Sequence, residues 1–198
     1  ISMIISIGTV VSSLLSDRLN RKFGTGPVTA VSVFMTAAAL FGFSLSGEFW
    51  MLCILAVPYG LGAGAVDAAL NNYVALHYSS RHMSWLHCFW GIGASAGPYI
   101  MGLCLRSRLG WQSGYRTIAI AQFILTAALF FSLPLWKKAD KSLKSNNGSS
   151  GDNGADKPVG FISSVKIRGV PLIMLAFFSY CAFESTAGLW ASSYFVSC

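Results

Sequence analysis

Few residues of this chain could do chemistry, and Asp67 is the first of them. It stands in the stretch GLGAGAVDAALNNYVALHY, where small residues are followed by a carboxylate and then by two amides. On a helix, Gly60 and Gly64 lie on the same face as Asp67 because the three are spaced i, i+4 and i+7. Asn71 follows on that face one turn later. We expect the glycines to let a neighbouring helix approach closely, and the acid and the amide to face protein or water rather than lipid.

The surroundings of Asp67 indicate what its carboxylate could do. It is the only formal charge in residues 49–80, a run longer than the roughly 20 apolar residues that cross a bilayer. A charge inside a membrane is costly, so it is a functional candidate by default. Because desolvation disfavours the charged form of an acid, such a carboxylate can take up and release a proton. Asp67 is therefore a candidate for proton coupling and, with Asn71, for binding a polar substrate.

A second acid, Glu184, stands in the last apolar run. It is the only charge of residues 169–198 and lies near the middle of that run, with Tyr180 one turn before it on the same face. Two interpretations are open. Glu184 could form an ion pair with an arginine of a span outside this sequence, or it could line a cavity. We favour the cavity, with Glu184 as a candidate for proton coupling and substrate binding and Tyr180 as a candidate for substrate binding.

The composition indicates which elements must position these residues. The chain is 54% hydrophobic and only 11% charged, whereas soluble domains carry about 25% charged residues. Almost uncharged runs cover 1–16, 27–46, 49–80, 82–105, 117–136 and 169–198. The sequence therefore predicts an all-α polytopic membrane helix bundle with five complete spans and one that begins inside the membrane.

The first run allows two interpretations. A signal peptide has basic residues before its apolar core, but here the charges of SDRLNRK come after it. We therefore favour a truncated span over a signal peptide, and we expect the chain to be a piece of a longer protein.

The basic residues are distributed unequally between the loops. Eleven of the fourteen lie in alternate loops, at 16–26, 77–83 and 137–168. This asymmetry is typical of cytoplasmic loops, and it explains the net charge of +7 without a nucleic-acid partner. The five cysteines lie in apolar runs without metal-ligand spacing, so we expect packing roles for them and no metal. We expect a multi-pass protein of the plasma membrane, or of the inner membrane in a bacterial cell.

The first loop, SSLLSDRLNRKFG, carries a specific charge pattern. Taken alone, it could be a basic anchor at the headgroups. It also resembles the signature loop of the major facilitator superfamily, G-x-x-x-D-[RK]-x-G-[RK]-[RK], between that family's second and third spans. At the positions of the motif's two glycines this chain has Ser13 and Asn20. Asn, like Gly, tolerates the left-handed turn conformation. The resemblance implies a conformational latch formed by the matching residues Asp17, Arg18, Arg21 and Lys22.

Residues 83–105 form a second polar and glycine-rich segment. His87 and Trp90 share a face, Gly93 and Gly97 supply a small-residue track, and Pro98 should kink the helix. Taken alone, His87 could be a hydrogen-bonded packing residue or a proton relay, and we favour packing. The kinked helix is a plausible moving part.

A narrower resemblance joins this segment to the one around Asp67. The sequences GAVDAALNNYV and WLHCFWGIGASAGP look similar to the fourth and fifth spans of the fucose-permease-like sugar:proton symporters. The resemblance implies proton coupling at Asp67, in place of a Glu, and substrate binding at Asn71, His87 and Trp90. The last two stand where the fucose carrier has amides. The first span of that group's second half likewise resembles the segment with Tyr180 and Glu184.

The same alignment with the family predicts the domain organisation. Residues 1–136 correspond to spans two to six of an N-terminal helix half whose first span is missing. Residues 137–168 correspond to a cytoplasmic linker, expected to be largely disordered because its Ser, Asn, Gly and Asp tract cannot form a core. Residues 169–198 correspond to the first span of the C-terminal half. The remaining spans of the full-length chain are the expected structural partners.

We expect no enzyme and no cofactor, because no nucleophile stands with a base and no glycine-rich loop precedes a lysine. The expected function is proton-coupled uptake of a sugar or similar small polar solute by alternating access, with protons and the bilayer as the other partners. The pattern Gly93-x-x-x-Gly97-Pro98 also resembles a motif of drug:proton antiporters, so efflux is an alternative. A non-transporting remnant is a third.

Overall fold

The computed structural model describes residues 1–147, 167 and 169–197, and every regular element in that part of the chain is an α-helix. The prediction of an all-α helix bundle is confirmed. Five of these helices are long and apolar enough to cross a membrane. In a membrane each backbone N–H and C=O must be satisfied within the protein, and a helix does this along its own length.

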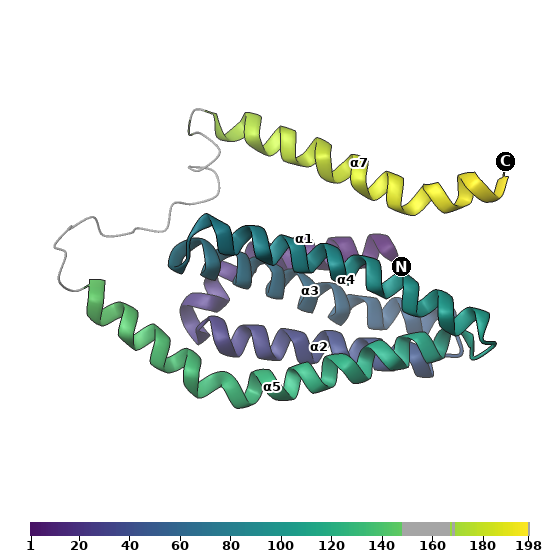
Figure 1. Ribbon diagram of the computed structural model, residues 1–198, viewed down its shortest axis with the longest axis horizontal. Helices are drawn as coiled ribbons and strands as arrows, with labels where there is room; N and C mark the ends of the chain where they lie inside the picture. The colour runs from purple at the N-terminus through teal and green to yellow at the C-terminus, as the bar shows by residue number, and fades with distance from the viewer. Residues whose placement is uncertain (148–166, 168, 198) are drawn as a thin grey trace. The chain divides into compact units, whose positions relative to one another are not determined.

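The helices follow the apolar runs of the sequence. Their bounds are α1 Ser2–Phe23, α2 Thr25–Leu45, α3 Phe49–His77, α4 Ser80–Arg106, α5 Gly110–Asn147 and α7 Val170–Ser197. Short turns join α1 to α2, α2 to α3, α3 to α4 and α4 to α5, so each helix runs back along its predecessor (Figure 1). The chain divides into two units, 1–148 and 149–198, and α7 is described by itself.

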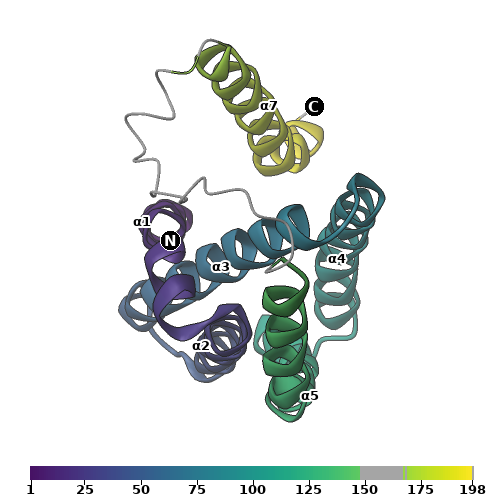
Figure 2. The same ribbon diagram turned by 90° about the vertical axis from the view of Figure 1, so that its left-hand side faces the viewer.

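Within the first unit, α3 occupies a central position. It packs against both α1 and α2, while α2 also packs against α5, and α4 chiefly contacts α5. Figure 2 shows α1 and α4 on opposite sides of α3. The main buried cluster joins Leu40 and Phe43 of α2, Ala56 of α3 and Ala119 of α5, and α2 has the largest number of buried residues. Consequently α2 and α3 together form the interior of this unit, and α4 lies at its edge.

The turn between α1 and α2 differs from the expectation. Residues 16–23, expected as a loop, continue α1 as a helix, so Asn20 does not take the left-handed conformation suggested for it. The reversal occurs at Gly24, with φ 84° and ψ 154°. That region of backbone space is accessible almost only to glycine. Asn20 can stay helical because a single glycine in this conformation, Gly24, is enough to reverse the chain.

The fifth helix is longer at both ends than the expected span 117–136. It begins at Gly110 and continues to Asn147, so the first part of the expected linker 137–168 is helical. The greater part of that linker lies outside the described residues, and its expected disorder stays a prediction.

Candidate functional site

The glycines of the candidate face on α3 lie against α1. Gly60 and Gly64 are both buried. A Cβ atom on Gly64 would lie 2.8 Å from Cα of Thr9, and one on Gly60 would lie 3.0 Å from Cα of Ile5. Real Cβ atoms are not found that close to a backbone. The absence of side chains at these two positions therefore allows α1 and α3 to meet backbone to backbone.

Hydroxyl groups of α1 reinforce this seam. The Ser12 hydroxyl donates a 2.5 Å hydrogen bond to the carbonyl oxygen of Leu61. The Thr9 and Ser13 hydroxyls each lie 3.3 Å from a glycine carbonyl oxygen of α3. Sequence reasoning missed these residues, although Thr9, Ser12, Ser13 and Ser16 are spaced i, i+3, i+4 and i+7, which is a polar helix face. That spacing in an apolar run was the available signal for a helix–helix contact.

Asp67 and Asn71 form a pair on α3. The Asn71 side-chain amide donates a 2.9 Å hydrogen bond to Oδ1 of Asp67. Asp67 is exposed and Asn71 is partly buried, and the other amide atom, Oδ1 of Asn71, is buried without a hydrogen-bond partner. At 1.5 Å per residue, Asp67 lies about 15 Å along the helix from His77, which is roughly the half-thickness of a hydrocarbon core. The pair presents an exposed carboxylate at membrane depth, held by the amide of Asn71.

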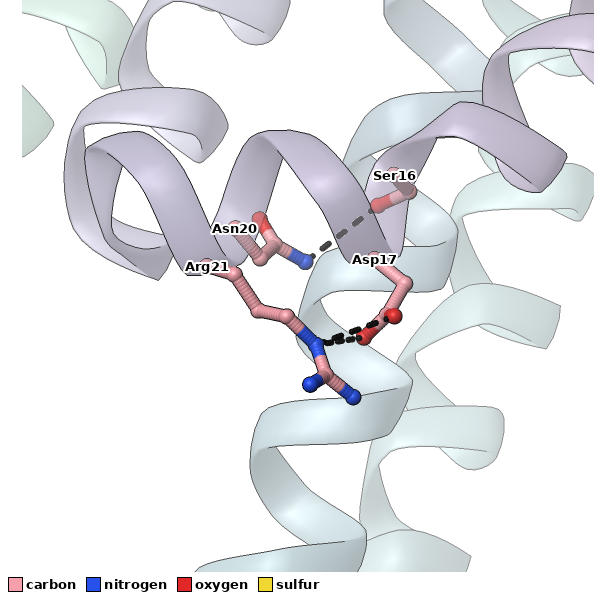
Figure 3. Close-up of polar contacts among 4 residues, drawn as sticks. All are labelled: Ser16, Asp17, Asn20 and Arg21. Atoms are coloured by element: carbon pink, nitrogen blue, oxygen red, sulfur yellow. Dashed lines mark hydrogen bonds and ion pairs between the residues drawn. The ribbon is translucent and has the colours of Figure 1, made fainter. Parts of the chain in front are cut away.

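The charged end of α1 is shown in Figure 3. Nε of Arg21 lies 3.1 Å from Oδ2 and 3.2 Å from Oδ1 of Asp17, one turn earlier. Asn20 donates a 3.3 Å hydrogen bond from Nδ2 to the hydroxyl of Ser16. Both charged side chains are more than half exposed, as is typical of a weak surface ion pair. Among the candidate latch residues, Arg18 forms no ion pair within the described part of the chain.

The candidates on α4 are arranged differently. His87 and Trp90 are exposed, and no hydrogen bond or ring contact joins them to Asp67 or Asn71 in residues 1–147. A Cβ atom on Gly93 or Gly97 would meet nothing within 4 Å. Pro98 lies inside the helix. This face of α4 thus has no partner among the residues that the structure describes, in contrast to the glycines of α3.

The candidates on α7 are close in sequence. Glu184 follows Tyr180 by one helical turn, and both side chains are exposed.

Aromatic residues gather where α3, α4 and α5 meet, and sequence reasoning did not single them out. The Tyr73 ring stacks on His77 with centroids 4.4 Å apart and lies 5.1 Å from the ring of Trp136 on α5. The His82 ring of α4 lies 5.2 Å from that of Tyr78. An aromatic belt at a helix end is typical of the membrane interface. This cluster therefore marks one interfacial end of the bundle.

Comparison with known proteins agrees with this architecture. The family model described as Major Facilitator Superfamily matches residues 1–197. No solved structure gives a significant match.

Two curated proteins are similar to the chain. One is "Bypass of stop codon protein 6" of Saccharomyces cerevisiae, 25% identical over 205 residues, which cover 94% of this chain and 41% of that protein. The other is "Probable sphingolipid transporter spinster homolog 1" of Arabidopsis thaliana, 24% identical over 132 residues, 65% of this chain and 27% of that protein. The chain spans less than half the length of either relative. Since the family model covers almost all of its residues, the chain belongs to the major facilitator superfamily, a family of multi-pass membrane transporters and not of enzymes.

Proposed function

We propose that the protein is a proton-coupled transporter of a sugar or a similar small polar solute. The observation that carries the proposal is the hydrogen-bonded pair of Asp67 and Asn71 on α3, 2.9 Å apart and about 15 Å along the helix from its polar end. An acid at that depth is retained in membrane helices mainly for function. The family membership supports transport as the general activity.

Proton coupling is assigned to Asp67. In this proposal Asp67 takes up a proton from the outer side and releases it towards a more alkaline cytoplasm. Protonation also changes its hydrogen bonding, because a neutral carboxyl can donate where a carboxylate only accepts. A substrate hydroxyl can use that difference, which couples the two binding events.

Substrate binding is assigned to the polar and aromatic candidates on three helices. Sugar hydroxyls suit the oxygens of Asp67 and Asn71, and a sugar ring can stack on an aromatic side chain. The full set of proposed binding residues is Asp67, Asn71, His87, Trp90, Tyr180 and Glu184, with Glu184 as a second proton-coupling candidate. We propose that rocking of the two halves about this set provides alternating access, at the plasma membrane.

The charged end of α1 is proposed as the latch of that cycle. The pair of Asp17 and Arg21 is exposed and local to one helix, so it can exchange partners at small energetic cost. Arg18 and Lys22 are the other members. The segments 16–26, 77–83 and 137–168 are proposed to lie on the cytoplasmic side.

Proton-coupled drug or multidrug efflux, that is, efflux of amphiphilic compounds, is the second candidate. The observation that favours it is the open glycine face of α4 at Gly93 and Gly97, the same positions that resemble an antiporter motif. The name of the Arabidopsis relative refers to sphingolipid transport, which is also transport of an amphiphile. A non-transporting remnant is the third candidate.

The test measures external pH in lightly buffered cells that express the full-length protein, with sugars added one at a time. Alkalinisation on adding a sugar is expected for the wild type and is expected to disappear in Asp67→Asn. Asp67→Glu keeps a titrating acid and should retain part of the response. The matched control is Glu48→Gln, an acid in the turn between α2 and α3, which should respond like the wild type.

Three results would contradict the proposal. Proton uptake driven by lipophilic cations, with no response to any sugar, would establish efflux instead. A response that survives in Asp67→Asn would show that the proton binds elsewhere, with Glu184→Gln as the next variant. No transport of any compound by a protein that reaches the membrane would favour the remnant.

A further inference from the structure

An apolar groove opens between α1 and α2 and has α3 as its floor. It has a volume of about 430 Å³. We call it the α1–α2 groove, and its lining residues are Ser12, Leu15, Leu19, Phe23, Pro27, Val28, Val31, Ser32, Met35, Leu61 and Ala65. None of these residues belongs to the proposed substrate or proton-coupling set.

The length and polarity of the groove match one half of a bilayer. From Ser12 to Phe23 it follows α1 for about 16 Å, and one leaflet contributes about 15 Å of hydrocarbon. The two polar residues of its lining are small, and the Ser12 hydroxyl already donates to the carbonyl oxygen of Leu61. The interior of the groove therefore offers only apolar surface, in a shape that fits an extended hydrocarbon chain.

Positive charge stands at one end of the groove. The Nζ atom of Lys22 lies 5.3 Å from the centroid of the Phe23 ring, which lines that end. Arg18 is exposed one turn before Lys22. Arg21 is paired with Asp17, whereas Arg18 and Lys22 have no carboxylate partner in the part of the chain described. Two uncompensated cations thus lie beside the mouth of an apolar groove.

The start of α2 adds to this charge. Pro27, in the first turn of α2, lines the same end of the groove, and that turn contains no acidic residue. The amide groups of a helix N-terminus carry partial positive charge. An anion at this end would meet Lys22, Arg18 and the start of α2, while its hydrocarbon tail would follow Leu19, Leu15 and Val31 towards Met35.

We propose that the α1–α2 groove binds one anionic phospholipid of the leaflet on the side of the 16–26 loop. An acyl chain fills the groove and the headgroup phosphate contacts Lys22 and Arg18. Basic sites between membrane helices bind anionic headgroups by this combination of charge and apolar contact. The inference is independent of the transported substrate, because none of its residues belongs to the substrate-binding or proton-coupling set, although Arg18 and Lys22 also belong to the proposed latch.

Native mass spectrometry of the full-length protein in detergent tests the proposal. The probes are phosphatidylserine and phosphatidylcholine with identical acyl chains. One saturable phosphatidylserine adduct is expected, retained at collision energies that remove phosphatidylcholine. Equal retention of the two lipids, or binding that never saturates, would overturn the proposal in favour of general lipid contact.

Two kinds of variant locate the site. Val31→Trp fills the groove at a half-exposed position and should weaken phosphatidylserine binding about tenfold or more, since several methylenes lose their contact. Its matched control is Val57→Trp on α3, a similarly exposed valine outside the groove, which should bind like the wild type. Equal binding by both tryptophan variants would overturn the assignment.

The charge variant keeps the test valid if Val31→Trp does not fold. Lys22→Gln changes an exposed side chain and should reduce the preference for phosphatidylserine over phosphatidylcholine about fivefold. The double variant Lys22→Gln with Arg18→Gln should reduce this preference about fivefold further. Binding of phosphatidylcholine should not change. An unaltered preference in the double variant would show that the headgroup lies elsewhere.

Discussion

The hydroxyl of Ser12 on α1 donates a hydrogen bond of 2.5 Å to the backbone carbonyl oxygen of Leu61 on α3. This bond crosses the seam in which Gly60 and Gly64 meet α1 without side chains of their own. Because a membrane offers little hydrophobic drive between helices, close packing and such interhelical hydrogen bonds hold the pair together. The seam fixes α3, and with it Asp67 and Asn71, relative to α1.

Gly64→Ala is expected to destabilise the protein. Its new Cβ would lie 2.8 Å from Cα of Thr9, and relieving this overlap of backbone and methyl group costs about 1 to 3 kcal/mol. Gly93→Ala is the matched control, since its Cβ meets nothing within 4 Å and alanine is the better helix former. The measurement is the melting temperature of the protein in detergent. Equal melting temperatures for the two variants would show that α1 and α3 are not in close contact.

Ser12→Ala should destabilise the protein less than Gly64→Ala does. It removes one interhelical hydrogen bond, and such bonds contribute about 0.6 kcal/mol on average in membrane proteins, with a maximum of about 1.7. Ser84→Ala is the control because the Ser84 hydroxyl donates its hydrogen bond within its own helix, to the carbonyl oxygen of Ser80. The free energy of unfolding of the two variants is measured by denaturant unfolding in mixed micelles. A decrease in this free energy for Ser84→Ala as large as for Ser12→Ala would contradict a special role for the seam.

Gly24→Ala tests the reversal between α1 and α2. With φ 84° and ψ 154°, this position should penalise any side chain by about 1 to 3 kcal/mol. Gly47 lies in the turn between α2 and α3, is absent from the positive-φ positions and has open space around it. Gly47→Ala should therefore leave the melting temperature nearly unchanged. If Gly24→Ala were equally neutral, the turn would have to adopt another conformation.

Asp17→Asn separates stability from transport. The exposed i, i+4 pair with Arg21 contributes about 0.3 to 0.5 kcal/mol, so the melting temperature should hardly change. If the pair belongs to the latch, the transport rate should fall strongly in the same variant. Thermal unfolding and uptake are measured on one preparation. A transport rate like that of the wild type would remove Asp17 from the proposed cycle.

The sequence determined the helices and part of the candidate site. The number of apolar runs predicted the helices, because hydropathy and backbone self-satisfaction are properties of each segment alone. The spacing of Asp67 and Asn71 likewise predicted that one turn separates them, and the hydrogen bond between them follows from that. The left-handed turn suggested for Asn20 was wrong, because local preference cannot decide between that residue and the nearby Gly24.

Only the tertiary structure decided which helix faces which. The sequence shows glycines at 60, 64, 93 and 97 alike, yet the first two lie against α1 and the last two meet no described residue. The α1–α2 groove draws its lining from three helices, and the ring contact of Tyr73 with Trp136 joins residues far apart in the chain. Hydropathy reports how well a segment dissolves in lipid, whereas a neighbour is selected by the shape of both surfaces, and that information lies in no single segment.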